Sequence, residues 1–80
     1  MNRHDQHLHN ARIQREWAAM ALRDSKYNQK RADEEYTAGN RVLASQYSKE
    51  AEVDLAWHNK RMMIAKREES MANGRTGGRR

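Results

Sequence analysis

The stretch Tyr36-Thr37-Ala38-Gly39-Asn40-Arg41 decides the fold of this chain. Gly39 is the only glycine before position 74, and glycine is the usual residue where a helix ends in a left-handed turn. Asn40 follows at once and can cap a second helix. Helical patterns extend on both sides, over about residues 5–38 and 40–72. Two equal arms around one tight turn predict an all-α, antiparallel two-helix hairpin, and two such hairpins could dimerise into a four-helix arrangement.

The composition favours helices throughout. Alanine and arginine occur 11 times each, proline is absent, and the β-branched residues are scattered singly. Asn2 or Asp5 can cap the first helix. Two capping residues, Asp24 and Ser25, also stand side by side within the first arm, so a break there and a three-helix fold stay open as the alternative.

Length and residue types exclude several classes of protein. The 80 residues allow one small domain, which we assign to residues 1–72, with a flexible glycine- and arginine-rich tail at 73–80. The lack of cysteine excludes disulfides and thiolate metal sites. No apolar run approaches the roughly 20 residues of a membrane-spanning helix, and no apolar signal segment follows the N-terminus. We therefore expect a cytoplasmic protein.

A seam between the two helices can be predicted from helical spacing. In helix one it comprises Ile13, Trp17, Met20, Ala21, Asp24, Tyr27, Asn28, Ala32 and Tyr36, and in helix two Leu43, Tyr47, Ala51, Leu55, His58, Met62 and Ala65. With Gly39 at the turn, the numbers of facing residues should sum to about 79, which sets Trp17 against Met62. Isoleucine, valine and leucine together make only 8 of the 80 residues. Such a hairpin is marginal alone, so something else is expected to cover part of its surface.

A second apolar stripe on helix two is the candidate partner-binding site. It is formed by Val53, Trp57, Ile64 and Met71, the last three of which are spaced by seven residues. Tryptophan is enriched at binding hot spots, so we interpret the stripe as an interface with a larger protein or with a second copy of the chain. The alternatives are a third helical layer inside the molecule and a solitary exposed tryptophan.

Catalytic, metal and cofactor sites are not expected. His4, His7 and His9 crowd a terminus without a fixed third ligand, and His58 is interpreted as a structural histidine near Asp24 and Asp54. The sequence has no phosphate-binding glycine loop and no HExxH motif, and two helices offer no cleft. We therefore predict no enzyme activity, no cofactor, no metal and no small-molecule substrate.

Basic residues support a nucleic-acid alternative. The net charge is +5, and the tail residues Arg75, Arg79 and Arg80 contribute three of these charges. Lys60 and Arg67 add basic side chains on helix two. Together they form an electrostatic footprint that nucleic acid could contact. A membrane role is not expected, because the apolar stripe is narrow and is flanked by charges of both signs.

The pattern Ala32-x3-Tyr36-x2-Gly39-x4-Ala44-x3-Ser48 resembles the helical hairpin found ahead of some Smr-type nuclease domains, and it is similar to the turn of tetratricopeptide hairpins. The resemblance covers 17 of the 80 residues, implies a hairpin and carries over no functional residue. The leading hypothesis is a non-enzymatic helical interaction protein that binds and modulates a larger partner protein, as a phage-type or accessory regulator would. The alternatives are an accessory nucleic-acid-binding protein and a self-assembling scaffold protein.

Overall fold

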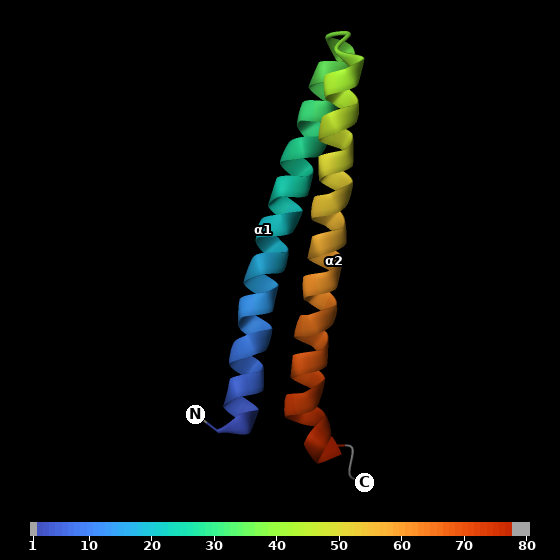
Figure 1. Cartoon of the computed structure of the whole chain (residues 1–80). Coiled ribbons are helices and arrows are strands. Elements are labelled where there is room, and N and C mark those ends of the chain that lie inside the picture. Colours follow the sequence, from blue (N-terminus) through green and yellow to red (C-terminus); the bar gives the residue numbers. More distant parts are fainter. Residues whose placement is uncertain (1, 78–80) are drawn as a thin grey trace.

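The computed structural model describes residues 2–77, with side chains as far as residue 73. This part of the chain forms two α-helices, α1 (Arg3–Thr37) and α2 (Arg41–Gly77). The helices lie side by side and antiparallel, and the molecule measures 59 × 24 × 12 Å (Figure 1). The prediction of an all-α, two-helix hairpin is confirmed, whereas dimerisation stays a prediction.

Helix α1 begins at a side-chain cap and continues without a break. The Asn2 Oδ1 atom accepts a hydrogen bond of 2.8 Å from the backbone N–H of Asp5, which satisfies one of the free donors of the first turn. The helix passes straight through Asp24 and Ser25. Ser25 is buried, and its hydroxyl donates to the backbone carbonyl of Ala51 on α2. The three-helix alternative is therefore wrong, because this serine joins the helices instead of ending one.

The turn has the hydrogen bonds of a Schellman motif. The N–H of Gly39 donates to the carbonyl of Tyr36 at 3.0 Å, and the N–H of Asn40 donates to that of Glu35 at 2.8 Å. Gly39 has a φ of +89°, a conformation that glycine adopts without steric cost. The side chain of Asn40 donates to Glu35, while its carbonyl accepts the first helical bond of α2 from Ala44. The turn is thus closed by the residues that the sequence marks.

Helix α2 is longer than expected. It continues to Gly77, beyond the predicted end at residue 72, so Asn73-Gly74 does not stop it. The side chains from residue 74 onward, with Arg75, Arg79 and Arg80 among them, lie outside the described residues. The flexible tail at 73–80 therefore stays a prediction.

The seam is formed by residues at every seventh position, and most of them are small. The residues at these positions are His4, Ala11, Ala18, Ser25 and Ala32 on α1 and Ala44, Ala51, His58, Ala65 and Ala72 on α2. All seven alanines among them are buried, and Ala18 and Ala65 have no exposed surface. Each buried methyl contributes only about 0.8 kcal/mol, but small side chains let the two backbones approach closely.

Three hydrogen bonds from side chains to carbonyls set the register. Besides the bond from Ser25, His58 Nδ1 lies 2.8 Å from the carbonyl oxygen of Ala18, and His4 Nδ1 lies 3.0 Å from that of Ala72. A carbonyl oxygen only accepts, so in both pairs Nδ1 of the imidazole is the donor. In each of the three pairs the residue numbers sum to 76. Every seam position that is not alanine therefore bonds to the backbone of the alanine facing it.

The predicted seam is wrong in register and in most of its α1 residues. The numbers of facing residues sum to 76 and not to the predicted 79. Trp17 does not pack in the seam against Met62, because its side chain is 47% exposed. The Met62 sulfur instead lies 3.9 Å from the Arg15 guanidinium. Close backbones leave room for a methyl group at the contact but not for an indole.

Polar pairs line one side of the alanine seam. Three of them cross between the helices: His7 with Glu68 at 2.6 Å, Asn28 with Asp54 at 2.8 Å, and Arg61 with Gln14 at 3.3 Å. The seam between the helices is consequently narrow and partly polar, and it leaves the larger apolar side chains on the outside.

Candidate interaction surface

The large apolar side chains of the hairpin are exposed. Trp17 is 47% exposed and Trp57 44%, and no large side chain among the described residues is fully buried. Others that remain exposed include Met20, Tyr27, Val53 and Met71. Exposed apolar side chains indicate an interaction site when they lie next to one another, because contiguous apolar patches mark contact sites.

Trp17 and Trp57 lie on the same side of the hairpin. Both line one shallow hollow of about 240 Å³ between α1 and α2, together with Met20, Ala21, Asp24, Asp54 and Arg61. The predicted stripe of α2 therefore does not stand alone. Part of the stripe predicted as the α1 seam lies beside it on the surface.

Heptad spacing extends this surface along both helices. Residues seven apart share a helix face, so Ile13 and Tyr27 align with Met20 on α1, and Ile64 and Met71 align with Trp57 on α2. We call the combined surface the aromatic face, and define it by Ile13, Trp17, Met20 and Tyr27 of α1 and Val53, Trp57, Ile64 and Met71 of α2. Of the four predicted partner-binding residues, Trp57 lines the hollow, and the grouping of Val53, Ile64 and Met71 with it stays a prediction. The four α1 residues are the part that sequence reasoning assigned elsewhere.

Arg61 holds the two tryptophans in place. Its guanidinium carbon lies 4.7 Å from the centroid of the Trp17 ring and 5.1 Å from that of Trp57. Lys60 adds a second cation, with Nζ 5.0 Å from the Trp57 centroid. Such cation–π contacts contribute about 0.5–1 kcal/mol each at exposed sites. The indoles are therefore oriented before any partner arrives, which lowers the entropy lost on binding.

Charges of opposite sign lie on either side of Trp57. Asp24 and Asp54 line the hollow on the side of the turn. Lys60 and Arg67 follow Trp57 toward the open end of the hairpin, and both are exposed. The aromatic face is thus apolar along its middle, acidic on one side of Trp57 and basic on the other.

The nucleic-acid candidates are only partly described. Lys60 and Arg67 stand seven residues apart on one flank of α2, so they share a face. Lys60 is also engaged with Trp57. Arg75, Arg79 and Arg80 lie outside the described side chains, so the grouping of all five residues stays a prediction.

The histidines have structural contacts. His4 and His58 bond to backbone carbonyls, and His7 bonds to Glu68. The interpretation of His58 as structural holds, although its partner is the Ala18 carbonyl and neither of the aspartates. Within the described part of the chain no three metal-binding side chains come together.

Ion pairs tie the open end together. Arg15 donates to both carboxylate oxygens of Glu69 at 2.7 Å. These hydrogen bonds lower the pKa of the Glu69 carboxyl below its ordinary value of 4.5 and raise that of the Arg15 guanidinium. Both side chains are more than a third exposed, so water screens the attraction, and the pair chiefly orients the helix ends.

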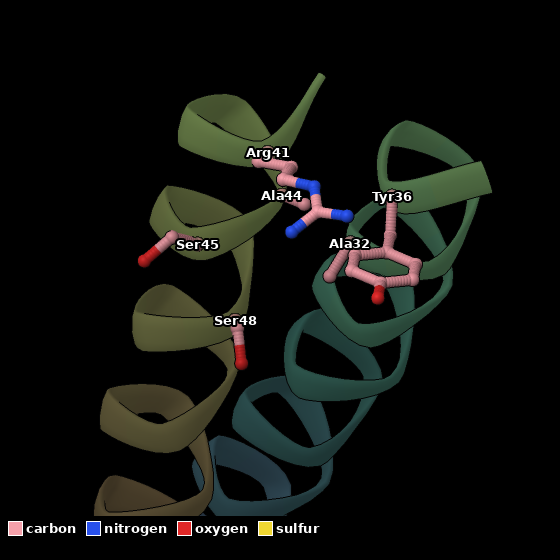
Figure 2. A pocket seen from close by; sticks show the side chains of 6 residues that line it. All are labelled: Ala32, Tyr36, Arg41, Ala44, Ser45 and Ser48. Carbon is pink, nitrogen blue, oxygen red and sulfur yellow. The ribbon is translucent and has the colours of Figure 1, made fainter. Parts of the chain in front are cut away.

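A second hollow, of about 400 Å³, lies beside the turn. Arg41 reaches from α2 to within 5.5 Å of the Tyr36 ring centroid on α1, and Ser45 and Ser48 line the α2 side (Figure 2). Ala32 and Ala44 form its floor, in keeping with the register of 76. The hollow is shallow, and it holds no cluster of buried titratable groups, so it is the weaker candidate for a site.

No family model, curated protein or solved structure matches this sequence. Among the described residues, neither helix combines the length and apolar character that crossing a membrane would require.

Proposed function

We propose that this chain is a non-enzymatic helical interaction protein that binds and modulates a larger protein through its aromatic face. One observation carries the proposal: the two tryptophans share a surface and stay about half exposed, while alanines fill the seam. The indoles are therefore not needed to hold the two helices together. A cysteine-free chain of this kind suits the reducing cytoplasm, which is where the proposal places it.

The composition of the face supports a protein partner. Tryptophan and arginine dominate binding hot spots, and here Arg61 is stacked between Trp17 and Trp57. Ile64 is half-buried and Met71 is exposed, and both continue the apolar strip toward the open end. Burying an aromatic side chain that is now half exposed contributes on the order of 1–2 kcal/mol, so a few such residues suffice for specific binding.

Affinity capture with the full-length chain, followed by mass spectrometry, identifies the partner. Purified partner is then titrated with wild-type chain and with Trp57→Ala. We expect the variant to bind at least about tenfold more weakly while its helicity stays the same, because a hot-spot tryptophan contributes 2 kcal/mol or more. Met63→Ala is the matched control, because Met63 is 64% exposed and points about 120° around α2 from Trp57. Loss of helicity in Trp57→Ala would show that the face is part of the folding core and would refute the proposal.

A second candidate function is nucleic-acid binding through Lys60 and Arg67 with the tail residues Arg75, Arg79 and Arg80. The exposure of Arg67 beside Lys60 on one flank favours it. Binding to a short duplex should then weaken steeply with salt and on deletion of residues 74–80. Unchanged binding after that deletion, or none at low salt, would remove this candidate.

A further inference from the structure

The row of polar pairs beside the alanine seam has one gap, and the hollow beside the tryptophans lies there. On either side of the gap the pairs cross between the helices, Gln14 with Arg61 and Asn28 with Asp54. At the gap itself, α1 contributes only the methyl group of Ala21. Positions 14, 21 and 28 share one face of α1, because they are seven residues apart. The small side chain at position 21 therefore leaves a space that its neighbours in the row fill.

The walls of the hollow combine apolar and acidic side chains. Trp17, Met20 and Trp57 supply the apolar surface, and Asp24 and Asp54 supply two carboxylates. Both tryptophans are about half exposed, so the hollow is open to a side chain that approaches from outside. Such walls fit a cation on an aliphatic stem, because the stem packs on the apolar surface while the charge meets the carboxylates.

The two carboxylates are available to such a cation. Among the residues with described side chains, the ion pairs involve other carboxylates. Asn28 donates to Oδ2 of Asp54 at 2.8 Å, which holds this side chain at the wall. A carboxylate accepts about four hydrogen bonds, so Asp54 keeps most of its capacity. The Arg61 guanidinium is engaged with the indoles, and the lining residues carry two negative charges against its one positive charge.

The chemistry and the size of the hollow favour arginine. The planar guanidinium carries five N–H donors and can bridge two separate carboxylates, whereas the lysine ammonium is a more strongly hydrated point charge. With Arg61 in place the hollow has a volume of about 240 Å³. Pockets for drug-sized ligands measure roughly 300–1,000 Å³, so this one suits a single side chain.

We propose that this hollow receives an arginine side chain of the partner protein, with its guanidinium between Asp24 and Asp54 and its aliphatic stem along the two indoles. This inference rests on the proposed function, because it names the chemistry of the partner at the same face. The net charge of +5 opposes a basic ligand at a distance, but physiological salt screens charges beyond about 8 Å. The two carboxylates that line the hollow therefore attract the guanidinium once it is close.

The test is an NMR titration of the full chain with N-acetyl-arginine amide. The matched probe is the corresponding citrulline amide, in which a neutral urea replaces the guanidinium. We expect arginine at millimolar concentration to shift the indole N–H signals of Trp17 and Trp57 and the amide signal of Ala21. Citrulline has nearly the same shape without the charge, so it should leave these signals nearly unchanged. Added salt should weaken the response to arginine.

Three variants test whether the hollow is the binding site. Asp24→Asn removes one carboxylate and should weaken arginine binding by about two- to fivefold, as expected for a partly exposed ion pair. Glu52→Gln makes the same change of charge at an exposed position of α2 outside the hollow, so it should have no effect. Ala21→Gln fills the gap with the residue type found at position 14 and should abolish arginine binding. Circular dichroism checks its helicity, and the comparison of Asp24→Asn with Glu52→Gln decides alone if Ala21→Gln unfolds.

Three results overturn the inference: equal responses to arginine and citrulline, undiminished binding to a folded Ala21→Gln variant, or equal losses in Asp24→Asn and Glu52→Gln. With the captured partner, Asp24→Asn should weaken binding and Glu52→Gln should not. A partner that needs Trp57 but ignores Asp24→Asn leaves the proposed function standing and refutes the arginine inference. If the hollow binds arginine but the partner ignores Trp57→Ala, the proposed function fails, and with it the assignment of the arginine to the partner.

Discussion

The alanine seam buries the smallest side chains of the hairpin, and the aromatic face exposes its largest ones. Most folded proteins do the reverse. In the seam the smallest side chains are buried, with Ala18 and Ala65 at 0% exposure. On the aromatic face the largest side chains, Trp17 and Trp57, remain 47% and 44% exposed. The difference teaches that the hairpin is held by close backbone approach and a few hydrogen bonds, which leaves its hydrophobic residues available for a second layer or a partner.

Replacing a buried alanine of the seam with a larger side chain should destabilise the hairpin more than any other change considered. Ala18→Leu inserts a side chain where the helices leave no room, and overpacking of this kind costs about 1–3 kcal/mol, a large part of the stability of so small a domain. We expect thermal unfolding, followed by circular dichroism, to move to a much lower temperature. The adjacent Ala19→Leu is the control, because Ala19 is exposed. An equal or higher midpoint for Ala18→Leu would mean that the helices are not in close contact.

Removing a hydrogen bond from the seam should have a smaller effect. Ser25→Ala makes that position alanine like its neighbours, but it loses the 2.9 Å bond to the Ala51 carbonyl. The expected loss is about 1 kcal/mol in the free energy of unfolding, measured by urea titration. Ser45→Ala is a matched control, because Ser45 is exposed. A stabilised Ser25→Ala would show that alanine alone specifies the register.

A change on the aromatic face should act through association. If two copies associate through this face, the wild-type unfolding midpoint rises with chain concentration, and Trp57→Ala should remove that dependence. At high dilution its stability should differ from wild type by no more than about 1–2 kcal/mol, the loss of the two cation–π contacts. Unfolding midpoints measured across a dilution series separate the loss of association from the loss of the cation–π contacts within one chain. A large fall at every dilution would place Trp57 in the folding core and erase the contrast with the seam.

Acid should loosen the open end slightly. The pKa of Glu69 is lowered in the folded chain by its hydrogen bonds to Arg15, so the pair stabilises the fold above the ordinary glutamate pKa of 4.5. This contribution declines as the pH falls below that value and is lost once the pH passes the lowered pKa. Unfolding midpoints of wild type and Glu69→Gln should converge over that range. A constant difference between them would mean that the carboxylate charge does not contribute.

Much of the fold could be predicted because it depends on local signals. Gly39 and Asn40 mark the turn, and the composition of the arms determines that they are helical. The seam register was harder, since the spacing rules rank apolar residues first and place Trp17 and Tyr27 inside. The signal that was available is the run of small residues at 11, 18, 25 and 32, repeated at 44, 51, 65 and 72.

The candidate site was half predictable for a related reason. The spacing of Trp57, Ile64 and Met71 identified the stripe on α2 from sequence, because one helix fixes which of its residues share a face. That Trp17 and Met20 lie beside it, and that Arg61 sits between the two indoles, depends on the register between helices. One helix in isolation contains no information about that register.

The sequence by itself determined two helices, one turn and the stripe on α2, because backbone propensity and helical periodicity act over a few residues. Only the tertiary structure decided that alanines form the seam, that the numbers of facing residues sum to 76, and that both tryptophans share one face. The physical reason is that the gap between two helix backbones admits a methyl group and the few polar groups that reach a carbonyl. This steric limit excludes the larger side chains from the seam, whatever their hydrophobicity.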